Sequence, residues 1–375
     1  MPVTVRSFAK INLGLSIGAL RPDGFHELRT VYQTIALHDI IRVQVVRGAG
    51  IEILCDDPRV PRDQSNTCHR IVERAMAVLK ARGRVIVEID KRLPVQGGLG
   101  GASANAVATL LALERALKKE LPGPERLRIA AEVGSDSPLF LVGGAVLGVG
   151  HGEEVYPLPD LPAVLCVVAT PDVGVSTPQA FADWDSRMDR EGSVAREPVE
   201  LRSTWTAGGG RPHTTKDKAV GLRPTWTAEG GRPHTELTGL NPSDRMLEFG
   251  RELSAWLSTQ NKAKSGKGLS GVPAGGRGRA ETPLLDLVRT GIENDFEQVV
   301  FPQYPELREV KSVLMRAGAF YASLSGSGSA LYGLFASRAT AKKAAVRLRK
   351  TGVGAQVTTT LTRRQYWRKF LVSGF

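Results

Sequence analysis

The stretch that decides the fold reads Pro94-Val95-Gln96-Gly97-Gly98-Leu99-Gly100-Gly101-Ala102-Ser103-Ala104-Asn105, with four glycines within five residues. A β-rich run at 84–89 precedes it, and an Ala/Leu-rich helical pattern at 104–117 follows. Strand, glycine loop and helix start form an arrangement that binds phosphate, because the backbone can approach the anion and the first helix amides lack partners. Glycines alone also fit a tight turn, so the rest of the chain must decide between a phosphate-binding loop and a simple turn.

The composition is that of a globular protein. The length of 375 residues suggests two domains or one large domain, and 42% hydrophobic and 23% charged residues suit packed cores. Cys55, Cys68 and Cys166 are widely spaced, which argues against a zinc site or a disulfide framework. No signal-like N-terminal segment or long apolar run is visible, so we expect a cytoplasmic protein without a membrane span.

The net charge of +12 comes mostly from the C-terminal end, where ten Lys and Arg and no acidic residues follow Ala336. The helical pattern at 339–350 distributes its bases around a face typical of solvent exposure. Nucleic-acid binding through this basic end is the alternative interpretation.

The N-terminal segment alternates between apolar and polar residues from Ile11 to Ile17, which indicates a strand. The same alternation places Lys10 and Asn12 on the polar face. A turn signal, Pro22-Asp23-Gly24, follows, and Phe25 and His26 come directly after it. These two residues fit either a recognition surface or the end of a turn.

Further elements follow from periodicity and from Gly and Pro positions. Asp136, within Gly134–Pro138, fits a turn or a helix N-cap. The Gly/Ser loop at 325–329 offers a second set of backbone amides for an anion. Strands are expected at 39–46, 51–55, 139–149, 164–169, 320–324, 330–335 and 354–360, and helices at 66–80, 126–133, 241–257, 284–300, 305–317 and 339–350.

A change of character from about 185 to 280 indicates an insertion. Residues 201–214 and 222–235 are near-copies, rich in Gly, Pro, Arg and Thr and poor in aliphatic residues. Two copies cannot form a solenoid. We expect a largely disordered segment of low complexity.

Several of these stretches resemble the motifs of the GHMP small-molecule kinases. The glycine loop resembles their phosphate loop, 9–13 their first motif and 325–329 their third. When residues 21–28, 134–138 and 292–297 are added to these three motifs, the chain resembles one family within the GHMP kinases. Members of that family use ATP to phosphorylate the 2-hydroxyl of 4-diphosphocytidyl-2-C-methyl-D-erythritol in the non-mevalonate isoprenoid pathway. The resemblance covers about 1–185 and 283–360. Departures are Phe25 where the family often has Tyr, Gly100-Gly101-Ala102 in the glycine triplet, and the insertion.

The resemblance implies an α/β (α+β) fold of two lobes, with an ATP-binding domain at 1–170, ribosomal-protein-like in its N-terminal part, and a second domain at 171–375. It implies ATP and Mg²⁺, with no metal ligand assigned, and a monomer or weak homodimer. Lys10 and Asp136 match the catalytic pair. ATP would be bound by Lys91, Pro94, Val95, Gln96, Gly97, Gly98, Leu99, Gly100, Gly101, Ala102, Ser103 and Ala104. The substrate would be bound by Asn12, Phe25, His26, Thr177 and Phe181.

Three alternatives remain at this point. Another GHMP kinase, such as a mevalonate, homoserine or galactose kinase, is the nearest, although residues 23–28 disfavour it. A basic nucleic-acid-binding protein comes from a different class. A pseudokinase is disfavoured because Lys10, Asp136 and the glycine loop are all present. No Walker motif occurs in the chain.

Overall fold

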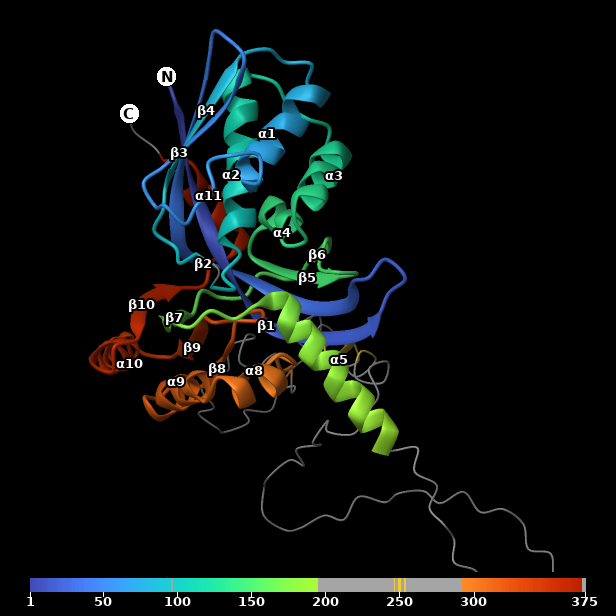
Figure 1. The fold of residues 1–375 in the computed structure, drawn as a ribbon. Helices are drawn as coiled ribbons and strands as arrows, with labels where there is room; N and C mark the ends of the chain where they lie inside the picture. The colour runs from blue at the N-terminus through green and yellow to red at the C-terminus, as the bar shows by residue number, and fades with distance from the viewer. Residues whose placement is uncertain (96, 195–245, 247–248, 251–252, 254–291, 373–375) are drawn as a thin grey trace, which may run out of the picture.

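The computed structural model describes residues 1–95, 97–194, 246, 249, 250, 253 and 292–372, and they form two lobes (Figure 1). The first lobe is built on a six-stranded sheet. Within it, β2 (His26–Val46) pairs antiparallel with β1 (Val3–Leu20), β4 (Arg84–Asp90) and β5 (Ala145–Val149). Strand β3 (Gly50–Cys55) pairs with β4, and strand β6 (Glu154–Pro157) pairs with β5.

Four helices cover one face of this sheet: α1 (Thr67–Val78), α2 (Gly101–Leu117), α3 (Gly123–Val133) and α4 (Ser137–Val142) (Figure 1). The local sequence explains their starts. The Asn66 side chain caps α1 by accepting from the Cys68 amide. Alternating Val85, Val87 and Ile89 of β4 are buried against the helices.

The second lobe contains an antiparallel sheet in the order β10-β7-β9-β8. Its strands are β7 (Leu165–Thr170), β8 (Tyr321–Leu324), β9 (Leu331–Phe335) and β10 (Gly354–Thr359). Its helices are α5 (Thr177–Val194), α8 (Glu297–Gln303), α9 (Pro305–Arg316) and α10 (Arg338–Lys350). The last helix, α11 (Arg363–Phe370), returns to the first lobe beside β1.

Strand β1 contributes to every hydrophobic cluster of the described residues. Val5 lies in the core between the first sheet and its helices, and Phe8 lies in a small cluster with Tyr366. Ile11 packs in the cluster between the lobes, and Leu15 packs in the core of the second lobe. One strand therefore connects both lobes.

The expected two-lobed α/β fold is confirmed, and several local expectations are wrong. Residues 139–149 do not form one strand, because Pro138 in the first turn starts α4 and Gly143-Gly144, both with positive φ, end it before β5. Residues 292–296 are not helical, because the Asn294 side chain accepts from the Phe296 amide and α8 begins only at Glu297.

The expected boundary near residue 170, between an ATP-binding domain and a second domain, stays a prediction. Strand β7, which ends at Thr170, pairs in the second sheet. Helix α5 runs to Val194, so the first residues of the expected insertion are helical. Neither α5 nor α11 was expected. The repeats and most of 241–291 lie outside the described residues. No helix in the described part of the chain is long and apolar enough to cross a membrane.

Candidate active site

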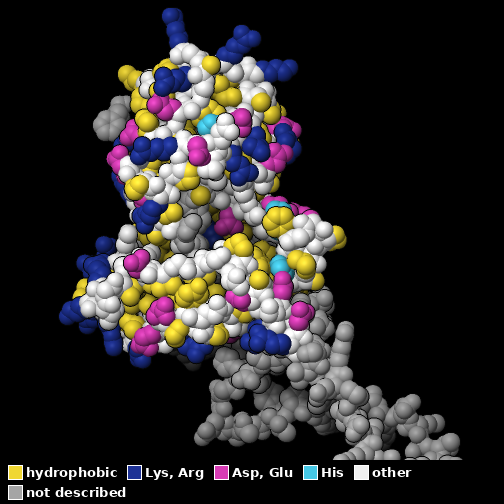
Figure 2. Space-filling model, in the orientation of Figure 1, with side chains coloured by type: hydrophobic (Ala, Val, Ile, Leu, Met, Phe, Trp, Pro, Cys, Tyr) yellow, Lys and Arg dark blue, Asp and Glu magenta, His cyan; other side chains and the backbone are white. Residues whose placement is uncertain are grey.

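A cleft of about 920 Å³ lies between the lobes, and Figure 2 shows the surface hollowed at this waist. Almost every site residue expected from the sequence lines it. Gln96 lies outside the described residues, and Ala104 is buried in the core, with its amide bonded to the Gly100 carbonyl. The expected residues that line the cleft are Lys10, Asn12, Phe25, His26, Lys91, Pro94, Val95, Gly97, Gly98, Leu99, Gly100, Gly101, Ala102, Ser103, Asp136, Thr177 and Phe181.

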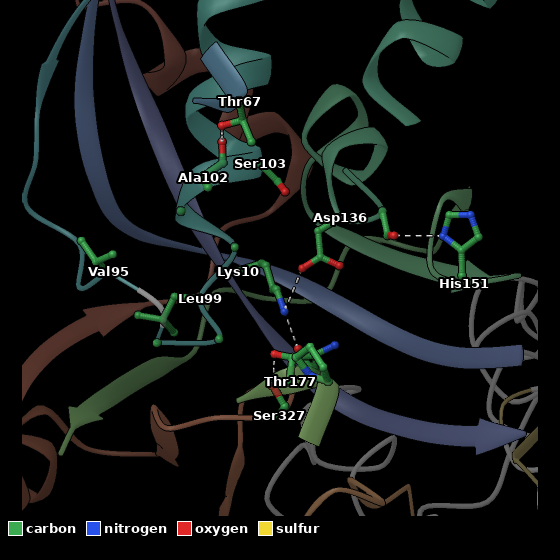
Figure 3. A pocket seen from close by; sticks show the side chains of 18 of the residues that line it. Lys10, Thr67, Val95, Leu99, Ala102, Ser103, Asp136, His151, Thr177 and Ser327 are labelled. Carbon is green, nitrogen blue, oxygen red and sulfur yellow. Dashed lines mark hydrogen bonds and ion pairs between the residues drawn. The ribbon is translucent and has the colours of Figure 1, made fainter. Parts of the chain in front are cut away.

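The centre of the cleft holds an ion pair between Lys10 and Asp136, with Nζ 3.2 Å from Oδ2 (Figure 3). Lys10 is buried and also donates to Asn12 Oδ1 at 2.7 Å. The side-chain Nδ2 of Asn12 donates in turn to Thr30 Oγ1 at 2.8 Å. The polar face of β1 therefore presents a fixed ammonium group to a partly exposed carboxylate.

Tyr32 on β2 was not singled out from the sequence. Its hydroxyl donates to Asp136 Oδ1 at 2.9 Å. Burial and the neighbouring Asp136 carboxylate raise the pKa of Tyr32 well above its usual value, so the hydroxyl stays protonated and remains a donor. Asp136 is thus oriented from two sides, by Lys10 on β1 and by Tyr32 on β2.

The glycine loop lies against both lobes. The Lys10 amide donates to the Leu99 carbonyl, and Ser325 Oγ donates to the Gly98 carbonyl at 2.9 Å. Gly98 has φ +71°, and a Cβ there would lie 2.1 Å from the Ser325 carbonyl oxygen. Only glycine permits this approach.

Helix α2 begins at Gly101, and no side chain caps it at Gly100. Its first residues, Gly101 to Ser103, line the cleft. Their amides have no intrahelical acceptors, and the helix dipole adds positive potential at this end. The arrangement suits an anion, as the sequence predicted.

Lys91 lies between β4 and the glycine loop, where it belongs to a buried cluster of polar groups around Asp39. Its Nζ lies 2.7 Å from Asp39 Oδ2, which also accepts from Asn105 Nδ2. Asp39 Oδ1 accepts from the amides of Arg92 and Leu93. Asp39 therefore ties the strand before the loop to the helix after it, and Lys91 neutralises it.

Four rings line the other end of the cleft. Phe25 stacks on His151, with ring centroids 4.9 Å apart, and His26 stacks on Phe181 at 4.8 Å. His26 Nε2 lies 2.7 Å from Asp185 Oδ1. Asp185 and His151 could not be selected from the sequence, because neither belongs to a recognisable local motif. Together the rings form an aromatic end suited to a flat base.

Thr177 and the Gly/Ser loop complete the lining from the second lobe. Thr177 Oγ1 lies 2.7 Å from Ser327 Oγ (Figure 3). A Cβ on Gly326 would lie 3.6 Å from Lys10 Nζ, so this loop runs beside the ion pair. Among the described residues, no group of three His, Cys, Asp or Glu side chains is placed to hold a metal ion.

The chain matches two family models, "GHMP kinases N terminal domain" over residues 66–144 and "GHMP kinases C terminal" over residues 281–354. A 4-diphosphocytidyl-2-C-methyl-D-erythritol kinase of Solibacter usitatus is 35% identical, over 89% of this chain and 81% of that protein. One of Desulfitobacterium hafniense is 30% identical, over 96% and 97%.

Solved structures agree with the fold. A crystal structure of 4-(cytidine 5'-diphospho)-2C-methyl-D-erythritol kinase matches with a TM-score of 0.61 and 25% identity, over 95% of this chain and 98% of that one. Homoserine kinase from Cytophaga hutchinsonii also reaches 0.61, at 19% identity over 96% and 95%, and this likeness shows the fold alone. The matches over most of the chain's length place it, within the GHMP kinases, in the 4-diphosphocytidyl-2-C-methyl-D-erythritol kinase family.

Proposed function

We propose that the protein transfers the terminal phosphoryl group of ATP to the 2-hydroxyl of 4-diphosphocytidyl-2-C-methyl-D-erythritol. The observation that carries this proposal is the placement of the Lys10–Asp136 pair, in one cleft between the start of α2 and the aromatic end. Three cysteines, all free and buried, fit the cytoplasmic location we propose for it. A monomer or weak homodimer remains our prediction.

Asp136 would accept the proton of the substrate hydroxyl, and Lys10 would stabilise the developing alkoxide and the charge on the transferring group. The amides at the start of α2 would hold the donor phosphates. Asn12, fixed by Thr30 and Lys10, would orient the acceptor. The rings of Phe25 and Phe181 would contact cytosine, and His26 would hydrogen-bond its edge.

Mg²⁺ is proposed as the companion of ATP. Ser103 lines the cleft in the first turn of α2 and offers a hydroxyl oxygen, and oxygen ligands are the ones Mg²⁺ prefers. Few protein ligands are needed where phosphate oxygens and water supply the rest. The ion would neutralise phosphate charge, and Ser103 is the side chain that would hold it.

The direct test is an ATP-dependent phosphorylation assay with a panel of acceptors. Turnover of the cytidylyl methylerythritol substrate, with little turnover of mevalonate, homoserine or galactose, is the expected result. A preference for one of the other three acceptors would replace this function with the second candidate, another GHMP kinase. RNA binding that persists at moderate salt would instead favour the nucleic-acid interpretation.

His26→Ala is expected to raise KM for the cytidylyl substrate about tenfold, since a base-edge hydrogen bond and a stacking contact are lost together. KM for ATP should stay unchanged, which provides the internal control. Steady-state kinetics with each substrate varied in turn measure both. Asp185→Asn should move the same constant in the same direction, because Asp185 holds His26. An unchanged KM for the cytidylyl substrate in His26→Ala would remove the recognition role.

Tyr32→Phe is expected to lower kcat about tenfold, because a hydrogen bond to a charged carboxylate is worth roughly 1.5 kcal/mol or more. Tyr321→Phe is the matched control: its hydroxyl donates to the Leu13 and Ile292 carbonyls, outside the cleft lining. Single-turnover rates should fall only in Tyr32→Phe. Equal rates in both variants would mean that the bond to Asp136 has no role in turnover.

A further inference from the structure

Helix α4 carries Asp136 at its N-cap and has only six residues. The last carbonyls of so short a helix have no intrahelical partners. Two side chains of α11 supply donors for them. Tyr366 Oη donates to the Phe140 carbonyl at 2.7 Å, and Trp367 Nε1 donates to the Val142 carbonyl at 3.1 Å. The end of α4 opposite Asp136 is therefore held by α11.

Tyr366 contacts the strand that carries Lys10 as well. Its ring lies 5.3 Å from the ring of Phe8, two residues before Lys10 on β1. Both rings are buried. The packing is close enough that a Cβ on Gly143 would lie 2.5 Å from the Tyr366 ring. A single buried side chain thus joins β1 to α4, the two elements that bring Lys10 and Asp136 together.

The residue that accepts this hydrogen bond also reaches the glycine loop. A Cβ on Gly100 would lie 3.1 Å from Cζ of Phe140 and 3.0 Å from Cγ of Lys10. Phe140 is buried and has little room to shift. A displacement of α4 would therefore move Asp136 and the contact with the loop at the same time.

We propose that Tyr366 is a positioning residue for phosphoryl transfer, because its hydroxyl and ring fix the distance between Lys10 and Asp136 from behind the cleft. Tyr366 does not line the cleft, so it acts through α4 and β1 and not on the substrate. This inference rests on the proposed function, and it concerns kcat and not substrate binding.

The test is Tyr366→Phe, which removes the hydroxyl and keeps the ring against Phe8. We expect kcat to fall about tenfold with both KM values unchanged, since small misplacements of reacting groups cost rate steeply. In an Asp136→Asn background the same substitution should cost almost nothing further, because residues that act through one another are not additive. A radiolabelled ATP assay measures the slow double variant.

Ile71→Val is the control for stability, because Ile71 is buried in α1, packs into the main core and does not line the cleft. It should lower the melting temperature without lowering kcat. The proposal is overturned if Tyr366→Phe loses as much activity in the Asp136→Asn background as in the wild type. It is also overturned if Ile71→Val lowers kcat to the same degree.

A second measurement separates this proposal from the proposed function. If the wild-type protein does not phosphorylate the cytidylyl substrate, the proposed function fails. Crystal structures of the wild type and Tyr366→Phe then test the positioning directly. A longer separation of Lys10 Nζ and Asp136 Oδ2 in the variant, against 3.2 Å here, supports it, and an unchanged separation overturns it.

Discussion

Asp136→Asn is expected to lower kcat for phosphorylation of the cytidylyl substrate about a thousandfold, which is within the range lost when a general base is removed. The amide has no carboxylate to accept the hydroxyl proton, and Lys10 loses its charged partner at 3.2 Å. The side chain is 29% exposed, so the fold should persist. Stopped-flow or radiolabel assays at saturating substrates measure the change.

Asp189→Asn provides the matched control, because Asp189 is an exposed carboxylate on α5 outside the cleft lining. It should turn over like the wild type. Both variants should give the same circular dichroism and the same KM for ATP. Near-normal kcat in Asp136→Asn would show that the hydroxyl proton leaves by another route, and that Lys10 alone supplies the electrostatic contribution.

Asp39→Asn is expected to reduce the free energy of unfolding by about 3 kcal/mol, as is typical when one partner of a buried ion pair is removed. Asp39 is fully buried, and both its oxygens are occupied by donors. An amide nitrogen in place of Oδ2 would face Lys91 Nζ and Asn105 Nδ2, which are themselves donors. Urea denaturation of the variant and the wild type measures the loss.

The double variant Asp39→Asn, Lys91→Met is the control for charge. Removing the ammonium group along with the carboxylate leaves no unpaired buried charge, so much of the lost stability should return. We expect KM for ATP to be higher than in the wild type in both variants. The reason is that the glycine loop loses the Asp39 carboxylate that binds the Leu93 amide and the Asn105 side chain. If the double variant is less stable than Asp39→Asn alone, the cost lies in packing and not in the charge.

The sequence predicted those parts of the site that depend on residues close together in the chain. Four glycines between a strand and a helix have few structural solutions, and strand alternation placed Lys10 and Asn12 on one face. The resemblance selected Asp136, which the spacing of residues could not distinguish from an ordinary N-cap. The polar face of β1 and the free start of α2 are confirmed in the structure.

The residues that sequence analysis missed are those whose role depends on contacts between distant segments. Tyr32 faces Asn12 across the β1–β2 pair, and a signal for it existed. The turn at Pro22-Asp23-Gly24 predicts a hairpin, and extending the second strand would have paired Tyr32 with β1. Asp39, His151 and Tyr366 had no such signal, because their partners lie 16 to more than 200 residues away.

Strand β1 belongs to every hydrophobic cluster formed by the described residues, and this has a consequence for how the molecule denatures. Its side chains at Val5, Ile11 and Leu15 would each leave a different core if the strand detached. We therefore expect the two lobes, each with its own sheet in the described part of the chain, to melt in one transition. We expect this one shared strand to set the cooperativity of unfolding, and Lys10, the lysine proposed to be catalytic, lies near its middle.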